Sequence, residues 1–423
     1  MIILVLNCGS SSVKYSLFSM GHEEKRLIRG SIDRAGLDRA GLANAGSAWV
    51  HQGLMGEYQA DVRDYSHAVS MLLETLARSD HSILPSLDCI DAVGHRVVHG
   101  SDRFSSSVKI DDVVMNFLRD NLHIAPLHNP SNLAGIESIA RLLPNVPQVA
   151  VFDTAFHQTL PPHAYLYALP YELCEKHHIR RYGFHGISHS FIMQEAARIL
   201  NRPAGKLRLI TCHLGNGSSI AAIKNGASVD TTMGFTPLEG LAMGTRCGDL
   251  DPAIVLFLKD RAGMDPAEIS DLLNKKSGMA GLSGYSSDMR EILKAVYIDG
   301  RSGTLNVAHP HHERSKLALN IYIYRVKKYI GAYASALGGV DAIVFTGGIG
   351  QNLSAVQEEA CAGLEFMGAE IGVARDLGDG CCELSRPNSA VRVLTIPTDE
   401  ELMIARDTFR ILHTAGGFRR HGL

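Results

Sequence analysis

Three short segments combine glycine with small polar residues directly after apolar runs of the kind found in strands. They occupy residues 7–12 (NCGSSS), 215–219 (GNGSS) and 346–352 (TGGIGQN). Successive backbone N–H groups in such turns form a concavity that binds anions, and glycine lets the backbone approach a ligand closely. None of the three is a Walker A loop or a GxGxxG motif that opens a helix. Each alone is more often an ordinary turn than a phosphate site, but together they favour a site for nucleotide phosphates.

Charged residues in unusual contexts are the next candidates. Arg96 lies in GHRVVHG and Arg246 in GTRCGDLDP, both bounded by glycine. The guanidinium group suits carboxylate and phosphoryl oxygens, although a salt-bridged surface arginine is the alternative. Asp153 ends the apolar run QVAVFD. It therefore lies at the carboxyl end of a predicted strand, where α/β sheets bind ligands. Glu400, in IPTDEELMIA, is either a helix-terminal acid favoured by the dipole or a ligand of Mg²⁺ through water.

Histidines allow two kinds of chemistry. His185, in YGFHGISHS, could stabilise a phosphoryl group during transfer. It lies four residues before His189, as His95 lies four before His99, and this spacing can place two imidazoles on one helix face for zinc. No third zinc ligand has a fitting local spacing. The GxSxG motif of a serine hydrolase is also absent.

Strand-like and helix-like runs alternate along the chain, which predicts an α/β fold. Strands are expected at residues 2–6, 92–98, 148–152, 207–213, 342–345 and 391–396. Helices are expected at residues 66–77, 132–141, 190–200 and 315–336. Residues 29–56, rich in Gly and Ala, are interpreted as a loop-rich decoration, and residues 301–315 as a polar excursion.

One pattern occurs twice, about half a chain apart. An apolar strand, a Gly/Ser/Asn turn and a second strand are predicted at residues 2–18 and again at residues 207–223. The repetition suggests two similar domains that face one cleft, although Gly/Ser turns are common enough to recur by chance.

Composition narrows the class of protein. The 423 residues include 41 Lys+Arg and 44 Asp+Glu, a net charge of −3, which argues against a dedicated nucleic-acid binder. No apolar run approaches the ~18 residues of a membrane span, and the start lacks the basic residues of a signal peptide. The eight cysteines form no CxxC pair. These features predict reduced thiols in a cytoplasmic protein without nucleic-acid or membrane partners.

Seven segments resemble, in order, the motifs of the acetate kinase family, within the acetate and sugar kinase, actin-like superfamily. They are NCGSSSVKYSLF, VFDTAFHQTLPPHAYLYALPYE, RRYGFHGISH, HLGNGSS, TPLEGLAMGTRCGDLDP, FTGGIGQN and IPTDEELMIA, and the resemblance spans residues 2 to about 411. It implies two duplicated, ribonuclease H-like (actin-like ATPase) α/β domains with mixed sheets, flanking helices and a cleft between them. The expected domains are residues 1–155, to which residues 400–423 return, and residues 156–399. The resemblance also implies a homodimer.

The resemblance assigns roles to residues on the acyl and metal side. Asn7 and Glu400 match the Mg²⁺ positions, where Mn²⁺ can substitute, and Asp153 matches the essential acid. Arg96 and Arg246 match the arginines that hold the acyl carboxylate and the phosphoryl group, and His185 matches the histidine that stabilises the transition state. The apolar pocket for the acetate methyl group is matched by Val98, Leu127, Phe184 and Pro237.

It also assigns the nucleotide side. The phosphate-contacting turn is matched by Ser10, Ser12 and Lys14, and the nucleotide phosphate loop by His213, Leu214, Gly215, Asn216 and Gly217. The segments beside adenosine are matched by Asp288, Met289, Arg290, Gly348, Ile349, Gly350, Gln351 and Asn352. The family more usually has Glu at the position of Gln351 and Ala at that of Gly347. Both differences are expected to bear on the fit of the nucleotide.

The function implied by the resemblance is reversible, Mg²⁺-dependent transfer of the γ-phosphoryl group of ATP to acetate, giving acetyl phosphate and ADP. The alternatives are a propionate or butyrate kinase of the same family, a non-catalytic actin-like nucleotide binder, and a zinc hydrolase. In-line transfer needs positioning and charge stabilisation rather than covalent chemistry. The joint presence of Arg96, Asp153, His185 and Arg246 speaks against a mere binder.

Overall fold

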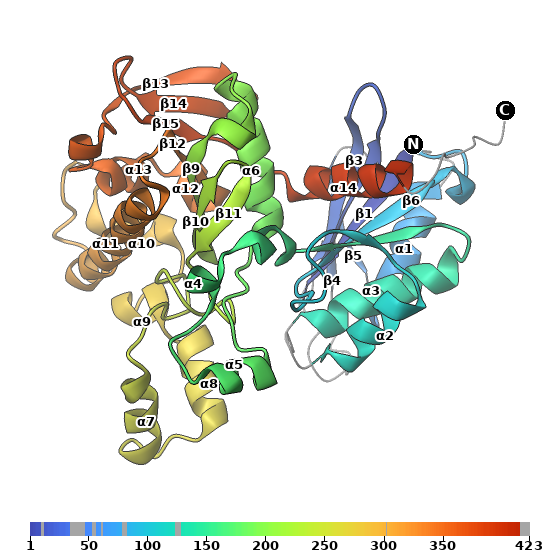
Figure 1. Ribbon diagram of the computed structural model, residues 1–423, viewed down its shortest axis with the longest axis horizontal. Helices are drawn as coiled ribbons and strands as arrows, with labels where there is room; N and C mark the ends of the chain where they lie inside the picture. The colour runs from blue at the N-terminus through green and yellow to red at the C-terminus, as the bar shows by residue number, and fades with distance from the viewer. Residues whose placement is uncertain are drawn as a thin grey trace. The chain divides into compact units, whose positions relative to one another are not determined.

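The computed structural model describes residues 1–9, 12–33, 47–52, 56–60, 62–77, 83–122, 128–301 and 303–414. The chain divides into two compact units, each with its own sheet (Figure 1). Unit 1 comprises Met1–Ala155 and Asp399–Leu423, and unit 2 comprises Phe156–Thr398. Asp399 belongs to unit 1, where its carboxylate accepts a hydrogen bond of 2.5 Å from Arg26.

Unit 1 contains an eight-stranded mixed sheet in the order β5-β4-β3-β2-β1-β6-β8-β7. Its strands are β1 (Ile2–Cys8), β2 (Ser12–Ser19), β3 (Lys25–Asp33), β4 (Ser47–Gln52), β5 (Gly56–Ala60), β6 (Ala92–Val97), β7 (Val108–Lys109) and β8 (Gln148–Phe152). Strands β1, β6 and β8 are parallel, and the remaining pairs are antiparallel. The helices are α1 (Tyr65–Ala77), η2 (Leu87–Cys89), α2 (Asp112–Asp120), α3 (Asn129–Leu142) and α14 (Glu400–Thr414).

Helices cover both faces of this sheet, because successive residues of a strand point to opposite sides. On β6, Val93 packs in one core with Leu72 of α1 and Ile139 of α3. The next residue, Gly94, faces α14, where a Cβ atom would lie 2.4 Å from Oγ1 of Thr408. Helix α14, red in Figure 1, thus returns from the end of the chain to pack among the earliest elements.

Unit 2 contains a seven-stranded mixed sheet in the order β11-β10-β9-β12-β15-β14-β13. Its strands are β9 (Arg208–Leu214), β10 (Ser218–Lys224), β11 (Ala227–Thr231), β12 (Ala342–Thr346), β13 (Ile371–Gly378), β14 (Cys381–Ser385) and β15 (Arg392–Thr395). Its larger helices are α6 (Gly186–Ile199), α7 (Pro252–Asp260), α8 (Pro266–Lys275), α10 (Met289–Val296), α11 (His312–Leu337) and α13 (Ser354–Cys361). Shorter helical turns are α4 (Pro162–Tyr165), α5 (Tyr171–His177), α9 (Gly278–Ser283), α12 (Gly347–Asn352), η5 (Ala204–Lys206) and η6 (Glu365–Met367), and η4 (Ala155–Thr159) begins at the last residue of unit 1.

The two sheets share one topology. The order β3-β2-β1-β6-β8 in unit 1 corresponds to β11-β10-β9-β12-β15 in unit 2. In each unit three antiparallel strands are followed by two that run parallel to the first. The predicted α/β fold and the duplication of the hairpin are confirmed.

The interpretation of residues 29–56 as a loop-rich decoration was wrong for the described part of that range. Strands β3 and β4 pair there, for example Ser31 with Val50, and widen the sheet. Glycine misled the interpretation: Gly30 does not break β3 but makes room for the ring of Tyr15, whose Oη would lie 2.5 Å from a Cβ at that position.

The end of the polar excursion at 301–315 belongs to α11, which begins at His312. The other predicted strands and helices are present, with ends displaced by a few residues. Among the described residues, no helix combines the length and the apolar character needed to cross a bilayer.

Candidate active site

In unit 1, the candidate residues gather at the edge where the parallel strands end. Asn7 lies near the end of β1, Arg96 near the end of β6, and Asp153 directly after β8. Nη2 of Arg96 donates to Oδ2 of Asp153 at 2.7 Å, and Nη1 approaches Oδ1 of Asn7 at 3.5 Å. Asp153 is 1% exposed. The buried negative charge of Asp153 is therefore balanced by the guanidinium group of Arg96. That group is held at the ends of the strands by Asp153 and Asn7.

The first turn of α3 holds two of these strand ends together. Nδ2 of Asn132 donates to the carbonyl oxygen of Cys8 at 2.7 Å, and its Oδ1 accepts from the backbone N–H of Val98 at 3.0 Å. Asn132 is 3% exposed, so both bonds are sheltered from water. The backbone after Asn7 and the backbone of the predicted pocket residue Val98 are thus tied to one side chain.

Glu400 begins α14 in the same unit. Burial raises the pKa of its carboxyl group to about 7, against the opposing effect of the Arg96 charge, while Asp153 raises it further. Lys14, exposed on β2, acts in the same direction as Arg96. The amide oxygen of Asn7 and the carboxylate of Glu400 are oxygen donors, which suit a magnesium ion that keeps several of its own waters.

The zinc alternative concerns the two histidine pairs. Among the described residues, no group of three or more His, Cys, Asp and Glu side chains could hold a metal ion. The two histidine pairs are engaged otherwise: His95 bonds to Gln148 at 2.7 Å, and both ring nitrogens of His189 bond to hydroxyl groups. His185 precedes α6 with φ of 56° and so does not share a helix face with His189.

In unit 2, the residues predicted to form the phosphate loop lie at the β9–β10 turn. The N–H of Gly215 donates to the carbonyl oxygen of Gly217 at 3.1 Å, and the carbonyl oxygen of Asn216 accepts from the N–H of Gly244 at 3.0 Å. The ring of His213 stacks on that of His185 with centroids 4.2 Å apart.

Two donors meet above this loop. A Cβ atom at Gly217 would lie 3.5 Å from Nη1 of Arg246 and 3.6 Å from Nε2 of His185. Arg246 also donates to the carbonyl oxygen of Pro237 at 3.2 Å, and burial lowers the pKa of its guanidinium group. Within the described part of the chain, Arg246 forms no ion pair with a carboxylate. A glycine at position 217 therefore leaves room for an anion in front of a guanidinium and an imidazole.

Beside this turn lies a cavity of about 650 Å³. This volume is within the range of small-ligand sites. The predicted residues among its lining are Gly215, Asn216, Asp288, Met289, Arg290, Gly348, Ile349 and Asn352. Ser287 and Leu353 also line it and were not predicted. Each directly follows or precedes a predicted residue in the sequence, and this adjacency was the only signal that could have identified them.

The two departures from the family pattern have different structural settings. Gly347 has φ of 78°, where a Cβ would lie 2.6 Å from the carbonyl oxygen of Leu214, so this backbone requires glycine. Gln351 does not line the cavity. Its carbonyl oxygen accepts from Gln357, and its side-chain amide lies 3.8 Å from a Cβ built at Gly380.

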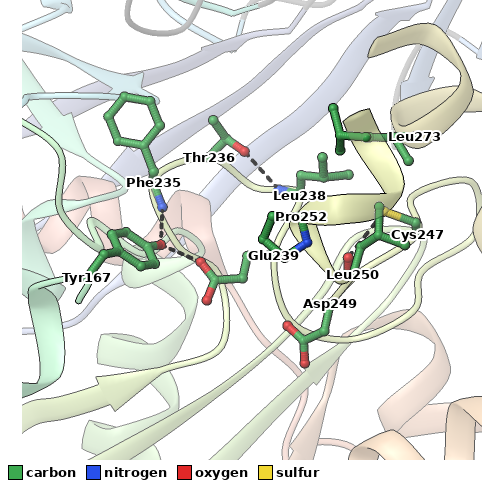
Figure 2. A pocket seen from close by; sticks show the side chains of 12 residues that line it. Tyr167, Phe235, Thr236, Leu238, Glu239, Cys247, Asp249, Leu250, Pro252 and Leu273 are labelled. Carbon is green, nitrogen blue, oxygen red and sulfur yellow. Dashed lines mark hydrogen bonds between the residues drawn. The ribbon is translucent and has the colours of Figure 1, made fainter. Parts of the chain in front are cut away.

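The segment that carries Pro237 and Arg246 borders a second cavity, of about 570 Å³ (Figure 2). Glu239 accepts hydrogen bonds from the hydroxyl group of Tyr167 and, at 2.6 Å, from Arg181. Asp249 accepts from the hydroxyl group of Tyr329 at 2.7 Å. The sequence analysis did not predict that Glu239 and Asp249 hold this segment through hydrogen bonds, although both acids occur in the motifs TPLEG and GDLDP.

The remaining predicted residues are placed as follows. Phe184 is buried beside His185, Ser12 begins β2, and Gly350 packs against Leu214. Ser10 and Leu127 lie outside the described residues.

Comparison with known proteins identifies the family of this chain. Residues 2–406 match the model of the acetokinase family. The chain is 49% identical to acetate kinases of Heliobacterium modesticaldum (97% of this chain, 100% of the relative) and Desulfitobacterium hafniense (97% and 99%). Among solved structures, acetate kinase of Porphyromonas gingivalis superposes with a TM-score of 0.86 at 46% identity (97% and 99% covered). A propionate kinase of Francisella tularensis superposes with a TM-score of 0.82 at 38% identity (97% and 99% covered).

The duplicated α/β fold and its superposition on solved acetate and propionate kinases define a phosphotransferase that acts on a carboxyl group. Within that class, the match over nearly the whole chain is decisive. The chain belongs to the acetokinase family.

Proposed function

We propose that this enzyme transfers the γ-phosphoryl group of ATP to acetate and back, with Mg²⁺, forming acetyl phosphate and ADP. The observation that carries the proposal is the meeting of Arg246 and His185 over Gly217, beside a cavity large enough for a nucleoside. Family membership supports the choice of substrates.

The chemistry divides between the units. Acetate is ionised at neutral pH, so its carboxylate oxygen can attack the γ-phosphorus without a general base. As the new P–O bond forms, the bond to the β-phosphate oxygen breaks, and ADP leaves with the electron pair. In unit 2, Arg246 and His185 stabilise the equatorial oxygens of the transferring group.

Unit 1 holds the acceptor. Arg96 binds the acetate carboxylate, and Val98 supplies an apolar contact for the methyl group. Asn7 and Glu400 would hold Mg²⁺ through water, where the ion offsets the charge of the phosphates. Asp153 orients Arg96 and ordered water rather than accepting a proton, since its carboxylate is already bonded to that guanidinium group.

A propionate or butyrate kinase is the second candidate, because one methylene group is worth only about 1–3 kcal/mol in an apolar pocket. The solved propionate kinase with a similar fold keeps this candidate open. Initial rates with ATP and Mg²⁺ across acetate, propionate and butyrate, with hydroxylamine as the trap, decide between them. Preference for a longer acid would move the substrate, and no acyl phosphate with any acid would refute the function.

We propose a homodimer in which α7 contributes to the interface. This helix contains no buried residue, and its Leu256 and Phe257 are 62% and 61% exposed. Neighbouring apolar side chains of this size rarely remain in water. Light scattering should show a dimer, and the Leu256→Glu/Phe257→Glu variant should be monomeric. A wild-type monomer would contradict the proposal.

All eight cysteines are unpaired, which supports a cytoplasmic location.

A further inference from the structure

A chain of hydrogen bonds leads from the core of unit 2 to the candidate transition-state histidine. Oγ of Ser219, on β10, lies 2.9 Å from Nδ1 of His185 and 2.8 Å from Nε2 of His189, on α6. Nδ1 of His189 lies 2.7 Å from Oγ1 of Thr211, on β9. Thr211, His189 and Ser219 are each 0% exposed. No water can therefore replace a bond that is oriented wrongly.

His189 is a neutral ring in this position. Burial lowers its pKa well below 6.5, and the rings of His157 and His213 oppose a positive charge from 5.6 and 6.4 Å away. A neutral imidazole carries one proton, so one ring nitrogen of His189 donates and the other accepts.

The buried end of the chain decides which nitrogen donates. In the described part of the chain, the hydroxyl group of Thr211 has one hydrogen-bonding partner, Nδ1 of His189. If Nδ1 carried the proton, the hydroxyl hydrogen of Thr211 would be buried without an acceptor, which is unfavourable. Thr211 therefore donates to Nδ1, and the proton of His189 lies on Nε2.

The remaining directions follow from that choice. Nε2–H of His189 donates to Oγ of Ser219, which leaves the hydroxyl hydrogen of Ser219 to donate to Nδ1 of His185. Nδ1 of His185 is then an acceptor, and its ring proton is on Nε2. This is the nitrogen 3.6 Å from the Cβ position of Gly217, where Nη1 of Arg246 lies at 3.5 Å. The ring of His213 also faces His185, and its Nδ1 bonds to Ser188 at 2.8 Å.

We propose that Thr211, His189 and Ser219 are positioning residues that hold His185 as a neutral imidazole with its proton on Nε2, directed at a phosphoryl oxygen. This deepens the proposed function and rests on it for the identity of the acceptor. His185 then stabilises the transition state as a neutral donor, and Arg246 supplies the charge. No proton needs to enter or leave the site in either direction of transfer.

Nitrogen NMR of the full-length wild-type protein, labelled with ¹⁵N-histidine, reads the tautomer directly. His185 is assigned by the signals lost in the His185→Asn variant. We expect Nε2 of His185 to have the shift of a protonated nitrogen and Nδ1 that of an unprotonated one at neutral pH. A proton on Nδ1, or on both nitrogens, would overturn the proposal. This readout stands even if the wild-type protein formed no acyl phosphate, so the two failures are distinguishable.

Kinetics test the consequence. Ser219→Ala should lower kcat by about 10–100-fold with the KM of ATP and acetate changed by no more than about twofold, because a transition-state donor loses its orientation. Thr211→Val should have the same effect at smaller size, about 3–10-fold, since it acts through two further bonds. Ser228→Ala is the matched control: Ser228 is equally buried and bonds to a buried ring, His157, at 2.8 Å. A folded Ser219→Ala enzyme with the kcat of the control would refute the positioning role.

Discussion

Units 1 and 2 share five strands in the same order and directions, yet the edges where their parallel strands end carry different chemistry. In unit 1 these ends bring Arg96 and Asp153 into a buried ion pair. In unit 2, β12 ends in Thr346 and a glycine turn, and the β9–β10 turn borders a cavity with room for a ligand. The same strand arrangement thus carries acidic side chains at this edge in unit 1 and glycine turns at this edge in unit 2.

The comparison teaches that the fold determines where loops meet, and the residues in them determine the chemistry. Two examples mark the difference. After β8, Asp153 has a carboxylate that can bind a charged group. After β12, Gly347 and Gly348 have no side chains, which leaves space for a ligand. In unit 1 the difference rests on charged groups, above all Arg96 and Asp153.

Asp153→Asn is expected to have the largest effect. It removes the carboxylate that fixes Arg96, and kcat should fall by about 10²–10³, as for the loss of one preorganised electrostatic partner. The KM of ATP should change little, because the cavity proposed for the nucleotide is built from unit 2. Initial rates at saturating Mg²⁺ measure both.

The matched control is Asp341→Asn, which also removes an arginine-paired carboxylate but at the amino end of β12. It should keep its kcat. Near-normal turnover of Asp153→Asn would remove the acid from the proposed site.

The second expectation concerns stability in acid. Burial lowers the pKa of His95, on β6, to about 4, from 6.5 in the unfolded chain. The folded state then binds fewer protons, so the stabilisation is complete above pH 6.5 and is lost as pH falls toward 4. The loss amounts to about 3 kcal/mol in unfolding free energy.

Urea denaturation followed between these pH values, for the wild type and for His95→Gln, measures this effect. The variant should lose less stability across the window. Equal slopes would mean that His95 is not the group that titrates.

Gly348→Ala tests unit 2. No atom lies within 4 Å of a Cβ at this position, which lines the cavity, so the methyl group should occupy nucleotide space without straining the fold. The KM of ATP should rise about 10-fold, with the KM of acetate unchanged. Gly331→Ala, in the open environment of α11, is the control and should leave both values as they are. An unchanged KM of ATP in Gly348→Ala would separate this cavity from the nucleotide.

Val98→Ala should give the smallest change, a rise of about fivefold in the ratio of propionate to acetate activity. Asn132 continues to hold the backbone of residue 98, so the change enlarges the pocket without moving its wall. Val114→Ala, on α2 in the core, removes the same atoms away from the proposed site and should leave the ratio constant. A constant ratio in Val98→Ala as well would show that this side chain does not bound the acyl group.

Much of the fold was accessible from sequence because local patterns report it. The apolar runs at β1, β6, β8, β9, β12 and β15 are buried strands, and the repeated hairpin does mark a duplicated topology. Prediction failed at β3 and β4, where pairing with a neighbouring strand outweighs the local weakness of glycine.

The types of the candidate site residues were also determined by the sequence, because glycine turns, arginines and acids after strands have few other uses together. Only the tertiary structure decided their partners. It brought Asp153 onto Arg96, placed Arg246 and His185 on the same side of Gly217, and left Gln351 out of the cavity lining. The bonds from Thr211 through His189 and Ser219 to His185 join β9, α6 and β10. No spacing along the chain encodes them, because hydrogen-bond direction depends on which buried groups are left without another partner.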